Sequence, residues 1–423
     1  MSNSDLIKNI KGYDILIFTY FPWDNPYSSV SFSFAKEFIK NNRVFYVNPP
    51  YTYRDVVRLK DEPMTKKRMP AFLKNKMQYE KIEAYPNMVA AQPPLTIPIN
   101  WLNNRSMYDR LHKHNEKKVI KTMEKVIRDN NIKDYIFLNC YYPFYLGTLP
   151  KELQPALNIY QCIDDISGND YTVKHGKRLE DEAIAKADIT LVTSTELHRL
   201  KSQISPDTYI LHNAADIAIF NKAREVVYDR PEEIKNIEGK IIGFTGNMDA
   251  DRIDYQLLKK IAAHHTDKTL LLVGPLNNTE YKEIGLDKME NVIFTGSKNI
   301  TVLPQYLQYM DCTLIPFKKN LVTKSIYPLK INEYLAAGKA VVARDFSNDI
   351  KSFGEDIYIG ENHEEIINLV DKAISENSEE RIEKRVAVAH TNTWTARVAQ
   401  FWDIVEDFLS KSESKKDTLV LKK

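Results

Sequence analysis

The sequence lacks the features that mark several large classes of protein. Its three cysteines, Cys140, Cys162 and Cys312, include no Cys-x-x-Cys pair, so we expect reduced thiols in a cytoplasmic protein. No apolar run approaches the ~18 residues that a membrane span needs, and residues 1–14 lack the apolar stretch of a signal peptide. A formal net charge of +2 over 423 residues gives no general case for nucleic-acid binding, and none is expected.

Several catalytic signatures are missing as well. There is no Gly-x-Ser-x-Gly, no P-loop and no three-glycine dinucleotide fingerprint. His264 and His265 are adjacent and would face different sides of a helix, which argues against a shared metal ion. Asp249-Ala-Asp251 spells a metal-binding Asp-x-Asp pattern, but three-residue matches are common by chance, and its place after a predicted strand favours a loop and a helix cap. We therefore expect no metal site.

The length and the pattern of apolar segments predict two domains. A single hydrophobic core usually stops growing at ~250–300 residues, and this chain has 423. Both halves alternate apolar strands with helical segments, which is typical of doubly wound parallel sheets. Ligands bind at the carboxyl ends of such strands, so functional residues should lie in the strand-to-helix loops. The predicted strands cover residues 13–19, 43–48, 135–139, 157–161, 188–193, 208–213, 240–246, 269–274, 291–296, 312–316 and 340–343.

One segment of the first half is strongly basic. Residues 51–81 carry nine Lys or Arg against four Asp or Glu, interleaved with apolar side chains. This pattern fits a solvated loop with a helical piece. It also fits an interfacial patch that rests on anionic lipid or receives a lipid-phosphate acceptor, since each basic residue near such a surface contributes ~1 kcal/mol.

The run from Ser325 to Val342 indicates a binding site at the start of a helix. A polar loop opens directly into the helix, Glu333 lies about one turn inside, and Gly338 ends the helix before a β-branched strand. A helix N-terminus presents free N–H groups and partial positive charge, which suit a phosphate. A carboxylate nearby can accept hydrogen bonds from the vicinal hydroxyls of a sugar. Together these features predict a nucleotide-sugar site.

Short motifs along the chain occur in a characteristic order. They are Leu211-His-Asn213-Ala-Ala-Asp216-Ile-Ala-Ile-Phe220, Gly243-Phe-Thr-Gly246, Leu272-Val-Gly274, Asp311-Cys-Thr-Leu-Ile-Pro-Phe317 and Glu333-Tyr-Leu-Ala-Ala-Gly338. In this order and spacing the chain resembles the retaining glycosyltransferases of the GT-B architecture (family 4, group 1 type), which use nucleotide-sugar donors.

The resemblance implies an α/β protein with two Rossmann-like domains that face each other across a cleft. We expect an acceptor-binding domain over residues 1–221 and a nucleotide-sugar donor-binding domain over 222–393, beginning with a charged hinge. A helix over 394–412 should cross back onto the first domain, followed by a basic disordered tail over 413–423.

The resemblance also assigns donor-binding residues in the second half. Glu333 matches the glutamate that holds the ribose, and Ser325 stands where the family has a second glutamate that touches the donor sugar. Lys330 and Arg252 are expected to meet the diphosphate, although Arg252 could instead form a salt bridge to Asp251 or Asp254. The expected donor-binding set is Gly246, Asn247, Arg252, Ser325, Tyr327, Leu329, Lys330 and Glu333.

In the first half the resemblance points to two loops. Trp23, Ser28 and Ser29 are expected to bind the acceptor, although packing by the tryptophan and helix capping by the serines are the alternatives. Asp164 or Asp165 is expected to orient the acceptor. The expected catalytic set is Asp164, Asp165, Arg252 and Lys330.

The function implied is transfer of a sugar from a nucleoside-diphosphate sugar to a glycan or lipid-linked acceptor with retention, in cell-surface polysaccharide biosynthesis. No metal or other cofactor is expected, because positioning and charge neutralisation are the main tasks. The protein would be cytoplasmic, with residues 51–81 against the inner membrane face. Two alternatives stay open: a sugar-nucleotide epimerase on the same fold, or a silent nucleotide-binding partner subunit, since Ser325 replaces an acid.

Overall fold

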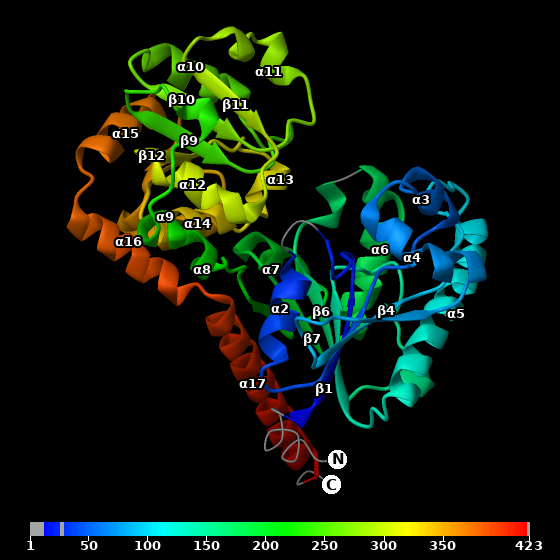
Figure 1. Ribbon diagram of the computed structural model, residues 1–423. Coiled ribbons are helices and arrows are strands. Elements are labelled where there is room, and N and C mark those ends of the chain that lie inside the picture. Colours follow the sequence, from blue (N-terminus) through cyan, green and yellow to red (C-terminus); the bar gives the residue numbers. More distant parts are fainter. Residues whose placement is uncertain (1–11, 26–28, 169, 421–423) are drawn as a thin grey trace. The chain divides into compact units, whose positions relative to one another are not determined.

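The protein has the α/β architecture with two sheets that its sequence predicts. The structure, a computed structural model, describes residues 12–25, 29–168 and 170–420 (Figure 1). The chain divides into two compact units. Of the described residues, unit 1 takes those up to Thr193, Leu197–Leu211 and those from Val398 on, and unit 2 takes Ser194–Glu196 and His212–Arg397.

The main segment of unit 2 begins at His212, before the boundary predicted at 222. The reason is that the two short helices after His212 contribute Ile217, Phe220 and Ala223 to the hydrophobic core of unit 2. The charged segment that was expected to be the hinge therefore lies inside the second unit.

Unit 1 is built on an eight-stranded sheet with the order β3-β4-β2-β1-β5-β6-β7-β8. All neighbouring strands are parallel except β3 and β4, which are antiparallel. The strands are β1 (Asp14–Thr19), β2 (Val44–Val47), β3 (Gln78–Lys81), β4 (Met88–Gln92), β5 (Tyr135–Cys140), β6 (Leu157–Cys162), β7 (Ile189–Val192) and β8 (Thr208–Ile210). Strands β1, β2, β5 and β7 are buried along their whole length, as expected for a parallel sheet covered on both faces.

The helices of unit 1 connect these strands and end with a segment from the far end of the chain. They are α2 (Val30–Phe38), α3 (Tyr53–Arg58), α4 (Pro63–Lys74), α5 (Arg105–Asp129), α6 (Asp170–Lys186), α7 (Thr195–Lys201) and α17 (Trp394–Val420). Among the described helices, none is long and apolar enough to cross a membrane.

Helix α17 packs against α2. The ring of Phe401 lies 5.1 Å from that of Phe38 and 6.3 Å from that of Phe34, centroid to centroid. The helix does not end at 412, and the tail predicted to be disordered over 413–423 is helical as far as Val420. No proline or glycine interrupts this run, so nothing local ends the helix.

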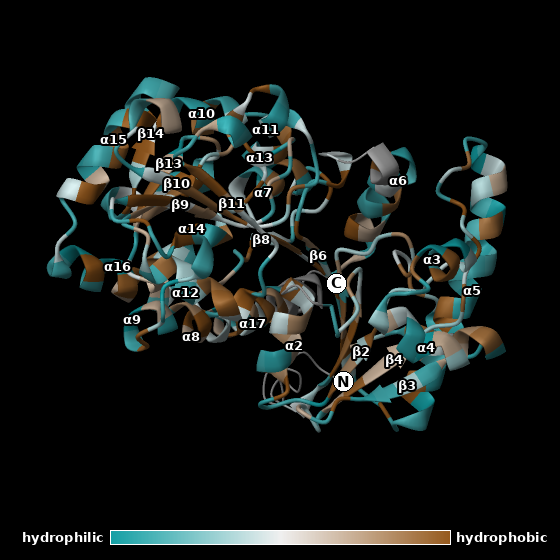
Figure 2. Ribbon diagram, turned by 45° about the horizontal axis from the view of Figure 1, so that its top comes forward, coloured by the Kyte–Doolittle hydropathy of each residue, from teal (hydrophilic) through white to brown (hydrophobic). Residues whose placement is uncertain are grey.

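Unit 2 is built on a six-stranded parallel sheet with the order β11-β10-β9-β12-β13-β14. Its strands are β9 (Ile241–Thr245), β10 (Thr269–Val273), β11 (Val292–Gly296), β12 (Cys312–Ile315), β13 (Ala340–Arg344) and β14 (Tyr358–Gly360). Figure 2 shows apolar colour along β9, β10 and β13, which form its core. Its helices are α8 (Ile217–Phe220), α9 (Lys222–Glu225), α10 (Tyr255–His264), α11 (Glu280–Glu283), α12 (Leu303–Gln308), α13 (Leu321–Lys324), α14 (Leu329–Ala336), α15 (His363–Ser375) and α16 (Glu379–Thr391).

Each sheet has a point where the strand order reverses. In unit 1 β1 lies between β2 and β5, and in unit 2 β9 lies between β10 and β12. Helices leave opposite faces of the sheet on the two sides of such a point, which opens a crevice at the carboxyl ends of the strands. These two places are where the fold favours ligand binding.

Candidate functional site

The reversal point of unit 2 is a place of close backbone approach. Gly246 follows β9 with φ +140°, and Gly274 follows β10 with φ +154°. A Cβ atom on Gly274 would lie 1.8 Å from the Gly246 carbonyl oxygen, so no other residue fits without moving the backbone. The loop after β9 is thereby held flat against the end of β10.

Helix α14 brings a lysine to the same place. No side chain caps its N-terminus at Pro328. Lys330, in the first turn, extends over Gly246, and a Cβ atom on that glycine would lie 2.3 Å from the lysine Cε and 2.7 Å from Nζ. The uncapped helix start, the ammonium group and the bare glycine backbone form a surface suited to a phosphate.

Glu333 lies one turn further along α14. Its side chain is about nine-tenths buried, and its Oε2 atom is 3.5 Å from Lys330 Nζ. That oxygen accepts no hydrogen bond from any described residue. A buried acceptor that receives no hydrogen bond costs ~1–3 kcal/mol of stability, and nearly all such groups in native proteins have a partner. The carboxylate is therefore placed and available to bind hydroxyl donors of a ligand.

The loop before α14 is packed inward. Ser325 is 2% exposed, and its hydroxyl donates to the Val322 carbonyl at 3.0 Å. The ring of Tyr327 stacks on His212 at 4.4 Å between centroids, and its hydroxyl accepts a hydrogen bond from Asn332. Both predicted donor-binding residues thus have contacts that shape the loop, and their role toward a sugar stays a prediction.

Arg252 forms an ion pair, but with a partner that the sequence did not indicate. Its Nη2 lies 2.5 Å from Oδ2 of Asp249, and Asn247 donates to the same oxygen at 3.1 Å. Asp254 instead caps α10 and pairs with Arg344 at 2.6 Å. Asp249 is therefore bound to an arginine inside the loop after β9, and Arg252 remains 43% exposed there.

In unit 1 the predicted acceptor residues have structural contacts. The indole N–H of Trp23 donates to Glu80 at 2.7 Å, and Lys67 Nζ lies 4.3 Å above its ring. Ser29 caps α2 by accepting the Phe32 N–H, which confirms the capping alternative. Ser28 lies outside the described residues.

The two acids after β6 differ in their surroundings. Asp165 accepts a hydrogen bond from the Ser167 N–H at 2.9 Å, which fixes the turn. Asp164 is exposed at the carboxyl end of β6. Neither observation assigns an acceptor contact, so the orienting role stays a prediction.

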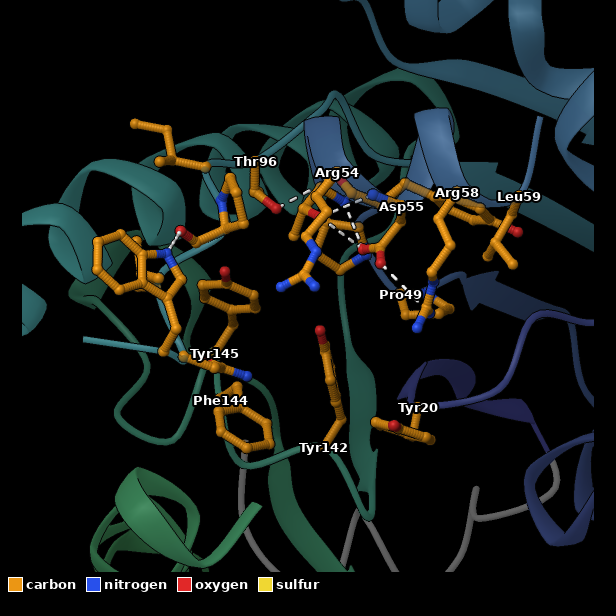
Figure 3. A pocket seen from close by; sticks show the side chains of 18 of the residues that line it. Tyr20, Pro49, Arg54, Asp55, Arg58, Leu59, Thr96, Tyr142, Phe144 and Tyr145 are labelled. Atoms are coloured by element: carbon orange, nitrogen blue, oxygen red, sulfur yellow. Dashed lines mark hydrogen bonds and ion pairs between the residues drawn. The ribbon is translucent and has the colours of Figure 1, made fainter. Parts of the chain in front are cut away.

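A pocket that sequence reasoning missed lies at the carboxyl edge of the unit 1 sheet (Figure 3). Its volume is about 550 Å³, within the ~300–1,000 Å³ of small-ligand sites. The signal for it is the aromatic run Tyr141-Tyr-Pro-Phe-Tyr145 directly after β5, together with Pro49-Pro50 after β2. The lining residues are Tyr20, Pro22, Pro49, Pro50, Tyr51, Thr52, Arg54, Asp55, Arg58, Leu59, Thr96, Ile97, Pro98, Ile99, Asn100, Trp101, Tyr108, Tyr142, Phe144 and Tyr145.

One cluster in the described part of unit 2 has the composition of a metal site. His264, His265 and Asp371 bring ligand atoms within 4.8 Å of one another. Lys268 Nζ lies 3.1 Å from the Asp371 carboxylate, so an ammonium group already occupies the anionic side of the cluster. Burial also lowers the pKa of His265, whose Nε2 contacts the Ile367 carbonyl. This arrangement is a structural contact between α10 and α15.

Sequence comparisons match the segment that carries the unit 2 site. Residues 239–376, from β9 to α15, match the family model described as "Glycosyl transferases group 1". A protein of Bacillus subtilis (strain 168) named as a teichuronic acid biosynthesis glycosyltransferase, TuaH, is 28% identical over 260 residues. That match covers 57% of this chain and 65% of the relative's length.

Comparison with solved structures extends over nearly the whole chain. An α,α-trehalose 6-phosphate synthase of Burkholderia multivorans has a TM-score of 0.67 at 9% identity, covering 95% of this chain and 100% of that chain. A sucrose-phosphate synthase of Thermosynechococcus elongatus has 0.64 at 13%, covering 94% and 100%. A trehalose-6-phosphate protein from E. coli bound with UDP-2-fluoro glucose has 0.64 at 12%, covering 93% and 99%. The fold is that of the GT-B glycosyltransferases.

Proposed function

We propose that this chain, whose residues 239–376 form a glycosyl transferase group 1 domain, transfers a sugar from a nucleoside-diphosphate sugar to a glycan or lipid-linked acceptor with retention. The observation that carries the donor site is the buried Glu333 carboxylate, which has one oxygen without a hydrogen bond beside Lys330. The name of the B. subtilis relative supports a product in cell-surface polysaccharide biosynthesis. The nucleotide sugar in the E. coli neighbour is consistent with such a donor.

The contacts in unit 2 support a role for each residue. Glu333 accepts hydrogen bonds from two neighbouring ribose hydroxyls, and the Lys330 ammonium beside Gly246 neutralises the diphosphate. Arg252, partly exposed in the same loop, adds a second cation when it turns from Asp249 to the leaving phosphate. The departing phosphate oxygen takes the acceptor proton, so no strong general base is needed. Catalysis then rests on positioning and on stabilising the charge that develops on the diphosphate.

Nucleotide binding to unit 2 tests the donor site directly. We expect one of the four nucleotides UDP, GDP, ADP and CMP to raise the melting temperature, since a ligand at 100 times its Kd adds ~2.7 kcal/mol to the free energy of unfolding. The shift should persist in EDTA and shrink strongly in Glu333→Gln. Glu355→Gln, an exposed glutamate of the same unit, is the matched control and should behave as wild type. No shift with any nucleotide would contradict the donor site, and loss of the shift in EDTA would contradict a metal-free site.

Turnover separates the proposed activity from the open alternatives. With the matching nucleotide sugar and cell lipids or glycans, we expect release of free nucleotide and a product whose anomeric NMR coupling matches the donor. A product that keeps its nucleotide would identify an epimerase instead. Tight nucleotide binding without turnover of any donor would identify a binding subunit, and an inverted anomer would exclude retention.

We also propose that α3 and α4 contact an anionic membrane surface. Val57 and Leu73 are 73% and 81% exposed on these helices. Lys60, Lys66 and Lys74 form no ion pair with any residue that the structure describes. Exposed apolar side chains among uncompensated lysines are typical of helices that lie on lipid. This surface would bring the enzyme to a lipid-linked acceptor.

A further inference from the structure

The pocket of unit 1 combines an aromatic wall with a basic rim (Figure 3). Tyr142, Phe144 and Tyr145 follow β5 and line one side, and Tyr20 follows β1 and lies next to Tyr142 with ring centroids 5.6 Å apart. Trp101, 64% exposed, lines the same pocket. Tyr20 is 39% exposed, whereas Tyr142, Phe144 and Tyr145 are 6–9% exposed, so the ring faces open to a ligand are those of Trp101 and Tyr20. Exposed aromatic faces pack against the apolar C–H face of a sugar ring while their polar ends stay hydrated. The wall is thus suited to a saccharide.

The rim carries two arginines and one aspartate, so its positive charge is only partly neutralised. Arg54 and Arg58 extend from α3 toward the space that Tyr142 borders (Figure 3). Asp55 is the one acidic residue among the described residues of the lining, and its Oδ1 lies 3.6 Å from Arg58. Its other oxygen accepts hydrogen bonds from Thr52. Arg54 forms no ion pair with any described residue, so its guanidinium is available to a ligand.

The start of α3 holds this arginine in place. Thr52 and Asp55 form a capping box, in which each side chain bonds to the backbone N–H of the other residue. Helix α3 also packs through Val56 and Leu59 on the cluster of Tyr51, Phe72 and Leu95. The helix that presents Arg54 to the pocket is therefore fixed by its cap and by a small apolar core.

We propose that this pocket binds the acceptor through an anionic group, a carboxylate or phosphate on or next to a sugar ring, and that Arg54 is the residue that selects it. A guanidinium matches both anions because its planar N–H fork bonds two oxygens at once. The sugar ring packs on the aromatic wall while the anion meets Arg54 at the rim. That the ligand is the acceptor rests on the proposed function, whereas the binding of an anionic sugar is a property of unit 1 alone.

Binding of small probes tests the inference without a donor. We measure affinity by calorimetry for methyl glucuronide, glucose 1-phosphate, farnesyl phosphate and the neutral methyl glucoside. We expect one anionic sugar to bind at least tenfold more tightly than methyl glucoside. The glucuronide arm reports a sugar carboxylate, glucose 1-phosphate a sugar phosphate, and farnesyl phosphate a lipid phosphate without a sugar.

Variants locate the binding. Arg54→Gln should weaken the affinity for the preferred anionic sugar tenfold or more and leave the affinity for methyl glucoside unchanged. Arg54→Lys should keep only part of the affinity for the anionic sugar. Lys121→Gln removes a positive charge from an exposed position of α5 outside the pocket and should bind as wild type. Equal affinity for neutral and anionic sugars, unchanged binding in Arg54→Gln, tightest binding of farnesyl phosphate, or no binding of any probe would overturn the inference. The nucleotide-induced melting shift of unit 2 is read separately, so failure of the donor site is distinguishable from failure of this pocket.

Discussion

At the scale of single residues, Lys339 carries a pH dependence of stability. It lies between α14 and β13 and donates a hydrogen bond to the Gln308 carbonyl. Burial lowers its pKa to about 8; Asp311 opposes this shift, and Arg385 adds to it. The unfolded lysine keeps its proton up to its ordinary pKa of ~10.4, so between about pH 8 and pH 10 the unfolded chain binds more protons. The free energy of unfolding of unit 2 should therefore rise with pH in this window.

Replacing Lys339 with methionine should remove this rise. At pH 7 the lysine is charged in both states, and removing its desolvation cost should stabilise unit 2 by ~1–3 kcal/mol. Urea unfolding at pH 7 and pH 9.5 measures both effects, with Lys235→Met, an exposed lysine of the same unit, as the control. A wild-type protein whose stability changes with pH no more than that of Lys339→Met would show that this lysine is not the titrating group.

Residue identity predicted some positions of the site and not others. Glu333 and Lys330 could be placed from sequence, because their position depends on the local loop-to-helix pattern around Pro328. The partner of Trp23 could not, because its side chain turns to a group that the local pattern does not specify. Trp23 bonds to a glutamate 57 positions away, which only the folded sheet brings near.

At the scale of elements, apolar runs predicted most of the parallel strands, but the short strands β4 and β14 and the polar strand β3 were not predicted. Strand β3, Gln78-Tyr-Glu-Lys81, pairs antiparallel with β4 at the sheet edge. Its buried residue is Glu80, which pairs with Arg68, so the usual apolar period is absent. The segment 51–81 could be read as a basic loop for the same reason, although it contains α3, α4 and β3.

This arrangement decides how the membrane proposal is tested. Deleting residues 51–81 would remove the buried Arg68 and Glu80 pair and a strand, so the fold of unit 1 would change with it. The double substitution Val57→Ser and Leu73→Ser alters exposed side chains and should preserve the fold. We expect it to reduce co-sedimentation with phosphatidylglycerol vesicles several-fold and to spare nucleotide binding.

Leu321, 85% exposed in unit 2, gives the matched control for that experiment. Leu321→Ser should sediment with vesicles as wild type does. Equal sedimentation of all three proteins would argue that α3 and α4 are merely solvated, which is the other interpretation of the basic segment.

At the scale of the molecule, the two sheets were predictable because each half repeats strand and helix with apolar strands. The sites follow from topology: Gly246 and the pocket of unit 1 lie at carboxyl ends of strands where the order reverses. The order of strands in a sheet cannot be predicted from which segments are strands, because it depends on the face of the sheet that each connecting helix crosses. The pocket was missed because its lining comes from separate segments of the chain, among them 20–22, 49–59, 96–101 and 142–145.

The molecule is also not two consecutive halves, because α17 completes unit 1 from the far end of the chain. Phe401 is 1% exposed and packs against Phe34 and Phe38. Phe401→Ala should therefore destabilise unit 1 by ~3–5 kcal/mol, the usual cost of emptying a buried aromatic site. Unit 2 should keep its nucleotide-induced melting shift, because its core contains no residue of this part of α17. Urea unfolding followed by circular dichroism measures the loss, and Asp403→Ala, exposed on the same helix, is the control. If Phe401→Ala proved as stable as Asp403→Ala, unit 1 would not depend on the helix, and residues 12–211 would be expected to fold alone.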